Sequence, residues 1–93
     1  GPCICFDCFE VGAEIGRRFA EEFHSEELVK PGKTGKAYVD IRAAIEIQLE
    51  ECGVLPQNIS AMPLCTFERS DLFYSYRRDR TKTGAMVSVL KLI

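Results

Sequence analysis

Apolar residues recur at every fourth position over residues 9–23, which predicts an amphipathic helix. The apolar stripe consists of Val11, Ile15, Phe19 and Phe23. Charged side chains occupy the other faces, so the stripe is expected to pack against the core. Asp7 and Glu10 have the spacing of a capping box, with Asp in place of the usual Ser or Thr, and would start this helix.

A second helix is predicted after Asp40, which is placed to cap its first turn. Gly53 has the position of the glycine that often follows a helix, and Pro56 prevents the helix from resuming. The expected buried stripe consists of Ile41, Ala44, Ile45, Leu49 and Cys52.

The remaining segments read as strands and a loop. Residues 1–6 are apolar and typical of a strand end, and β-prone runs follow at residues 59–64, 72–76 and 86–93. Pro63 restricts the first of these three runs to an edge or a strand end. Residues 24–37 are polar, contain Pro and Gly, and predict a surface loop. His24 opens this loop and is expected to be structural at the end of the first helix.

These elements predict an α+β (mixed α/β) fold in which two helices pack on a small mixed β-sheet. The chain has 93 residues, and no repeat or linker divides it, so residues 1–93 are expected to form one domain. The formal net charge of −2 argues against a nucleic-acid or anionic-membrane partner, because both require a basic face. No run approaches the roughly 20 apolar residues of a membrane helix.

Five cysteines are present: Cys3, Cys5, Cys8, Cys52 and Cys65. An odd number without a signal peptide favours reduced thiols and a cytoplasmic location. One interpretation makes the cysteines small buried apolar groups. A second makes Cys3, Cys5 and Cys8 a metal site, although zinc sites normally pair two cysteine turns and no second turn is evident. A third makes Cys8 a catalytic thiol at a helix start, without an evident histidine partner.

Residues 65–84 place an aromatic run directly before four cations. The aromatic residues are Phe73, Tyr74 and Tyr76, and the cations are Arg77, Arg78, Arg80 and Lys82. Aromatic faces stack on flat rings, and guanidinium groups bind phosphate or carboxylate, so the segment suits a nucleoside-like ligand. The alternative is a strand that ends in a solvated basic loop.

The same segment resembles the C-terminal signature of the YfiH-like family, also described as laccase-domain or polyphenol oxidoreductase proteins. The residues that carry the resemblance are Cys65-Thr66, Asp71-Leu72-Phe73, Ser75-Tyr76-Arg77-Arg78-Asp79 and Thr83-Gly84. Further matches are Gly1-Pro2-Cys3-Ile4, Cys8-Phe9-Glu10-Val11-Gly12, Asp40-Ile41-Arg42-Ala43-Ala44, Gln48-Leu49 and Gly53-Val54. Their order and spacing cover essentially the whole chain.

The resemblance implies a larger α/β sandwich of which this chain is the C-terminal part. Family members bind zinc through two His and one Cys, in an Ala-Asp-Cys motif and a His-Ala-Gly-Trp-Arg-Gly motif, and neither motif occurs here. The implied parent is a purine nucleoside enzyme that phosphorolyses adenosine or inosine and deaminates adenosine. Its partners would be a purine nucleoside and phosphate. The isolated chain is expected to be inactive, to expose sheet edges and apolar surface, and to need its N-terminal half or a second copy.

Within that resemblance, the expected substrate-binding residues are Phe73, Ser75, Tyr76, Arg77, Arg78 and Thr83. The two arginines would anchor phosphate or ribose, Phe73 and Tyr76 would form the pocket wall, and Ser75 and Thr83 would donate hydrogen bonds. Because neighbouring strand residues face opposite sides, Arg77 is expected to point into the site, with Arg78 paired to Asp79 or another carboxylate. No catalytic or metal-binding residue is assigned to this chain.

Two positions depart from the family pattern: Ala85 stands where an Arg is common, and Glu68 where a second Cys is common. Two other functions stay open. One is a copper-dependent polyphenol oxidase, although copper prefers His-rich or Cys/Met ligand sets that this sequence lacks. The other is a non-enzymatic interaction or structural module.

Overall fold

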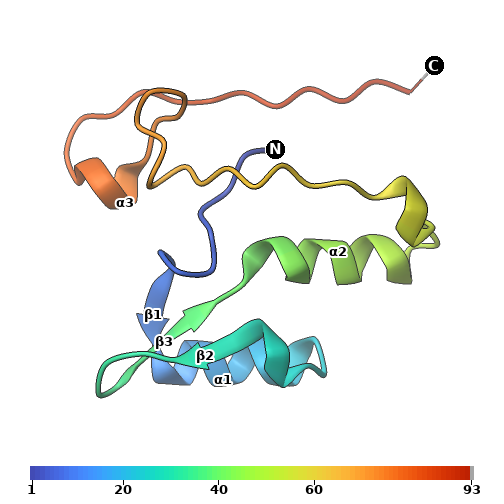
Figure 1. Cartoon of the computed structure of the whole chain (residues 1–93), viewed down its shortest axis with the longest axis horizontal. Helices are drawn as coiled ribbons and strands as arrows, with labels where there is room; N and C mark the ends of the chain where they lie inside the picture. Colours follow the sequence, from blue (N-terminus) through green and yellow to red (C-terminus); the bar gives the residue numbers. More distant parts are fainter. Residues whose placement is uncertain (93) are drawn as a thin grey trace.

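The computed structural model describes residues 1–92 and shows an α+β architecture, which confirms the predicted fold class (Figure 1). The elements follow in the order β1 (Glu10–Gly12), α1 (Ala13–Glu22), η1 (Glu26–Leu28), β2 (Val29–Pro31), β3 (Lys36–Val39), α2 (Ile41–Glu51), η2 (Pro56–Asn58) and α3 (Tyr76–Asp79). None of the helices in residues 1–92 has the length and apolar character that a bilayer crossing requires.

The sheet has three antiparallel strands in the order β1-β3-β2. Helix η1, strand β2 and the first two residues of β3 lie where the sequence predicted a surface loop over residues 24–37, so the loop prediction was wrong for these residues. The strands are only three or four residues long, too short for a clear alternation of apolar and polar positions. Gly35, at φ +77°, takes the left-handed conformation in the turn that joins β2 to β3.

Helix α1 begins at Ala13 and not at Phe9, because residues 10–12 pair with β3 instead. The expected capping box does not form: Gly12 is the N-cap residue and no side chain caps this helix. Gly16 is the point of closest approach to the sheet, since a Cβ there would lie 3.0 Å from side-chain atoms of Ala37 and Val29. The predicted apolar stripe is buried only in part: the rings of Phe19 and Phe23 stack at 5.8 Å, whereas Ile15 is 43% exposed.

Helix α2 matches its sequence prediction at both ends. The Asp40 carboxylate accepts a hydrogen bond from the Ala43 amide at 3.1 Å, and Gly53 follows the helix at φ +96°. The predicted stripe is buried only in part, however. Ala44 is buried, whereas Ile45 and Leu49 are 44% and 39% exposed. The face of α2 that carries these two side chains therefore keeps apolar surface accessible.

The strands expected at residues 1–6, 59–64, 72–76 and 86–93 are not present within residues 1–92, and Ile93 lies outside the described residues. Two long segments instead run extended above α2 in the view of Figure 1, without ladder hydrogen bonds. A β-prone sequence forms a strand only when another strand supplies the hydrogen-bonding partner. The described residues supply none, and residues 76–79 form the short helix α3.

Candidate functional site

Helix α3 and its N-cap residue include four of the six predicted substrate-binding residues: Ser75, Tyr76, Arg77 and Arg78. Ser75 is its N-cap, and the Ser75 hydroxyl accepts a hydrogen bond from the Arg78 amide at 3.3 Å. Arg80 ends the helix in the left-handed conformation, at φ 58°. The backbone there is helical and not extended, so the alternation argument for Arg77 and Arg78 does not apply.

Arg78 is fixed by carbonyl groups of the preceding loop. Its guanidinium donates to the carbonyl oxygens of Thr66 at 2.8 Å and Phe73 at 3.0 Å, with a longer contact to Phe67 at 3.3 Å. It also pairs with Asp79, as the sequence predicted, at 3.0 Å. The planar fork of arginine suits this arrangement, which ties α3 to residues 66–73.

Arg77 points to a different part of the chain. Its guanidinium donates to the carbonyl of Glu10, at the start of β1, at 2.7 Å. The same group lies 5.0 Å from the centroid of the Phe9 ring, within the range of a cation–π contact. The side chain is exposed, so Arg77 joins α3 to the sheet while remaining accessible to solvent.

The other predicted residues lie in different surroundings. Phe73 lines a hollow of about 480 Å³ between α2 and the extended segment after η2, and none of the other five lines it. Ser75 is buried, whereas Tyr76 is 70% exposed. The Thr83 hydroxyl lies 3.3 Å from an Asp79 carboxylate oxygen, which brings it to the C-terminal end of α3.

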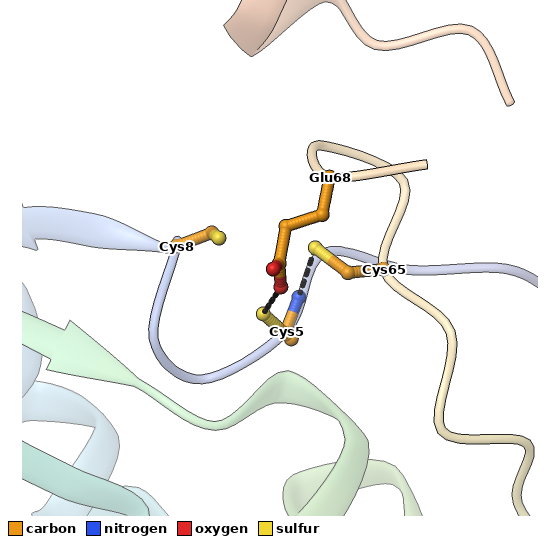
Figure 2. A group of neighbouring side chains, drawn as sticks. All are labelled: Cys5, Cys8, Cys65 and Glu68. Atoms are coloured by element: carbon orange, nitrogen blue, oxygen red, sulfur yellow. Dashed lines mark hydrogen bonds between the residues drawn. The ribbon is translucent and has the colours of Figure 1, made fainter. Parts of the chain in front are cut away.

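A second group of chemically reactive side chains gathers where the N-terminal segment meets residues 65–68 (Figure 2). We call it the thiol cluster; it consists of Cys5, Cys8, Cys65 and Glu68. The three sulfur atoms and one Glu68 carboxylate oxygen all lie within 4.8 Å of one another. The Cys5 thiol donates to the Glu68 carboxylate at 3.1 Å, and the Cys5 amide donates to the Cys65 sulfur at 3.2 Å.

The surroundings of the thiol cluster shift the pKa values of its three thiols in different directions. Burial, followed by the hydrogen bond to Glu68, raises the pKa of Cys5 far above its ordinary value. Burial also raises the pKa of Cys8. For Cys65, burial acts in the same direction, but hydrogen bonds from the amides of Cys5, Glu68 and Phe67 outweigh it and lower the pKa. Cys65 is therefore the thiol with the greatest thiolate character.

The sequence suggested a group of Cys3, Cys5 and Cys8. In the structure the side chains of Cys65 and Glu68 join Cys5 and Cys8, and Cys3 lies outside the group. Cys3 contributes through its backbone, whose carbonyl accepts a hydrogen bond from the Thr66 amide at 3.1 Å. The signal that could have identified the cluster is the equal spacing of two pairs, Cys5 with Cys8 and Cys65 with Glu68. Nothing in the sequence shows that the two pairs meet.

The only histidine of the chain, His24, is exposed just beyond α1 and takes no part in the thiol cluster. A zinc site of two His and one Cys therefore does not fit the residues of this chain.

Comparison with known proteins identifies relatives along the whole chain. Adenosine deaminase RL5, from an unknown prokaryotic organism, is 40% identical over 91 residues, covering 90% of this chain and 35% of the relative. A purine nucleoside phosphorylase of Deinococcus radiodurans is 34% identical over 92 residues, covering 99% of this chain and 34% of the relative. Purine nucleoside phosphorylase LACC1 of Homo sapiens is 34% identical over 98 residues, covering 99% and 21%.

The chain thus spans about a third of the length of the two prokaryotic relatives, and less of the human one. No solved structure matches it. A family model described as multi-copper polyphenol oxidoreductase laccase matches residues 1–93, the full length of the sequence. The chain belongs to this family, the YfiH family, whose curated relatives include purine nucleoside phosphorylases and an adenosine deaminase.

Proposed function

We propose that this chain forms part of a zinc-dependent purine nucleoside enzyme that phosphorolyses adenosine or inosine and deaminates adenosine. The observation that carries the proposal is the match of 90–99% of this chain to relatives named for these two activities. The ligands of the catalytic zinc would lie outside this chain, and a purine nucleoside and phosphate would be the substrates of the enzyme. The five free cysteines suit a reducing compartment, so we propose a cytoplasmic location.

In this proposal α3 presents Arg77 and Tyr76 to the substrate. Arg78 holds α3 in position through the carbonyls of Thr66 and Phe73, so its role would be to position Arg77. Arg77 is exposed and makes one hydrogen bond to a carbonyl, which leaves other N–H groups of its guanidinium for an anion. Phe73 would form the pocket wall, and Ser75 and Thr83 would donate hydrogen bonds near the two ends of α3.

The test uses the full-length protein and measures inosine phosphorolysis and adenosine deamination. Arg77→Ala is expected to raise the KM for phosphate or nucleoside by about 10-fold or more, as the loss of a charged hydrogen bond to substrate would. Arg78→Lys, at the neighbouring position, is the matched control. It is expected to lower the stability of the fold more than the affinity for substrate. Absence of both reactions in the wild-type protein would refute the proposal.

The family description itself favours one competing function, a copper-dependent oxidation of phenols. Incubation of the copper-loaded full-length protein with a phenol, with oxygen consumption as the readout, separates the two functions. Sustained oxygen consumption without nucleoside cleavage would favour the oxidase.

We also propose that the exposed apolar surface of this chain is covered in the intact protein, by its other residues or by a second copy. Ile45 and Leu49 on α2 and the extended segment 86–92 supply this surface. The isolated 93-residue chain would then act at most as a binding module. It is expected to show no turnover with inosine or adenosine, and measurable turnover would contradict this interpretation.

A further inference from the structure

The two halves of the thiol cluster are turns of the same kind. In the first turn, the Phe9 amide donates to the Cys5 carbonyl at 3.1 Å, four residues back. In the second, the Arg69 amide donates to the Cys65 carbonyl at 2.9 Å, again four residues back. Each turn thus carries its two ligand-type side chains with two residues between them, which is the spacing of the paired turns in structural zinc sites.

Distances within the thiol cluster suit a tetrahedral ion. Four ligand atoms, three sulfurs and one carboxylate oxygen, lie within 4.8 Å of one another. Zinc–sulfur bonds of roughly 2.3 Å place tetrahedral sulfur atoms about 3.8 Å apart, so small side-chain rotations would bring the ligands to bonding distance. Figure 2 shows all four side chains pointing into the same space between the two turns.

We infer that the thiol cluster binds one zinc ion, with Cys5, Cys8, Cys65 and Glu68 as its four protein ligands. The sequence argument against a site here was the lack of a second turn, and residues 65–68 supply that turn. On binding, zinc–sulfur bonds replace S–H bonds and the displaced protons pass to solvent, with no change of oxidation state. Four protein ligands leave no open position, so the site is structural and independent of the proposed enzymatic activity.

A backbone amide and an arginine lie close to the thiol cluster. The Cys5 amide, 3.2 Å from the Cys65 sulfur, is a hydrogen-bond donor of the kind that stabilises a coordinated thiolate. Arg42 donates to the carbonyl of Leu64, the residue before Cys65, at 2.8 Å, and lines a small hollow together with Cys5. Asp7, Asp40 and Glu46 line the same hollow, so the Arg42 guanidinium balances only part of the negative charge around the thiol cluster.

The first experiment measures zinc by elemental mass spectrometry in the full-length protein, reduced, loaded with zinc and desalted. Cys65→Ser is expected to lose one zinc per chain relative to the wild type, and this difference is unaffected by any zinc bound elsewhere. Cys3→Ser and Cys52→Ser are the matched controls, because both cysteines lie outside the thiol cluster. Loss of zinc in Cys3→Ser but not in Cys65→Ser would overturn the ligand assignment.

The second experiment does not depend on removing a buried cysteine. Glu68 is exposed, so Glu68→Ala and Glu68→Cys should fold like the wild type. Glu68→Ala is expected to weaken zinc binding at least about 10-fold in a competition titration with a chromogenic chelator. Glu68→Cys is expected to bind more tightly, and its cobalt(II) form should show stronger thiolate-to-metal charge-transfer absorption.

Three results would overturn the inference. The first is the same zinc content in the wild type and the Cys65→Ser variant. The second is no change in zinc affinity on replacing Glu68 by Ala. The third is a disulfide between two of the three cysteines in protein purified and analysed under inert gas, found by mass spectrometry of a non-reduced digest, because such a bond would consume the ligands.

Discussion

The side chain of Arg78 joins several parts of the chain, because its guanidinium reaches the carbonyls of Thr66 and Phe73 and the carboxylate of Asp79. In the sequence, basic residues after an aromatic run suggest a ligand-binding segment. In the structure, the two arginines have different surroundings. Arg78 is committed to the protein backbone, and Arg77 remains exposed. This division follows from the helical backbone at residues 76–79 and not from the strand alternation that the sequence predicted.

Replacing Arg78 by Ala is expected to lower the free energy of unfolding by about 2–3 kcal/mol, because partly buried carbonyl oxygens lose a charged donor. Urea unfolding followed by circular dichroism measures the change. Arg78→Lys should recover only part of the loss, since an ammonium group cannot bond several carbonyls in one plane. Arg77→Ala removes one hydrogen bond to a carbonyl and a cation–π contact with Phe9, both at an exposed side chain, and should cost about 1 kcal/mol. Equal losses for Arg77→Ala and Arg78→Ala would contradict the structural role given to Arg78.

The ion pair of Asp79 with Arg78 predicts a specific dependence of stability on pH. Hydrogen bonds from Arg78 hold the pKa of Asp79 below its ordinary value of 3.8. The ionised carboxylate therefore stabilises the fold in full above about pH 5, and the contribution is lost as the pH falls through the lowered pKa. Asp79→Asn should be less stable than the wild type at pH 7 and equal to it near the acid end. A difference that persists unchanged at low pH would show that the carboxylate charge is not the cause.

At the scale of elements, the sequence predicts features that depend on neighbouring residues, such as helix ends, but not the pairing of distant strands. The ends of α2 depend on Asp40 and Gly53, whose effects act within one turn, and both predictions are confirmed. Residues 59–64, 72–76 and 86–92 have strand-like sequences, but a strand requires a neighbouring strand that a local pattern cannot reveal. The thiol cluster could not be predicted for the same reason, because 60 residues separate Cys5 from Cys65.

Asp40→Ala is expected to lower the free energy of unfolding by about 1 kcal/mol, because the Ala43 amide loses its capping acceptor. Asp40→Asn keeps an acceptor oxygen and should be nearly neutral. Thermal unfolding of the three proteins under one buffer condition provides the comparison. If Ala and Asn at this position gave the same stability, capping would not be the contribution that Asp40 makes.

For the whole molecule, the main feature is apolar surface that the described residues leave uncovered. Val87, Val89, Leu90 and Leu92 are 85–92% exposed along one extended segment. Extended backbone with free hydrogen-bonding groups and apolar side chains readily pairs with another chain. Because of this segment and the exposed face of α2, we expect copies of the isolated chain to associate with one another.

Accordingly, the isolated 93-residue chain is expected to self-associate with rising concentration in sedimentation velocity experiments. Replacing Val89 and Leu90 by Lys should shift the distribution toward monomer, because charge on an exposed edge opposes pairing. Ser88→Lys is the matched control, since it adds charge to the same segment while removing no apolar side chain. A wild-type chain that stays monomeric at all concentrations would contradict this expectation.

The meeting of the two turns in the thiol cluster has a consequence for chain connectivity. The contact between Cys5 and Cys65 closes a ring of the polypeptide that contains the sheet, α1 and α2. A ring of this size, once cross-linked by an ion, would lower the conformational entropy of the unfolded chain. If it behaves as a disulfide loop does, this would raise the free energy of unfolding by about 4 kcal/mol. It would also keep the molecule in one piece after a protease cut in the exposed turn at residues 33–35, so that two fragments remain a single particle until the ion is removed.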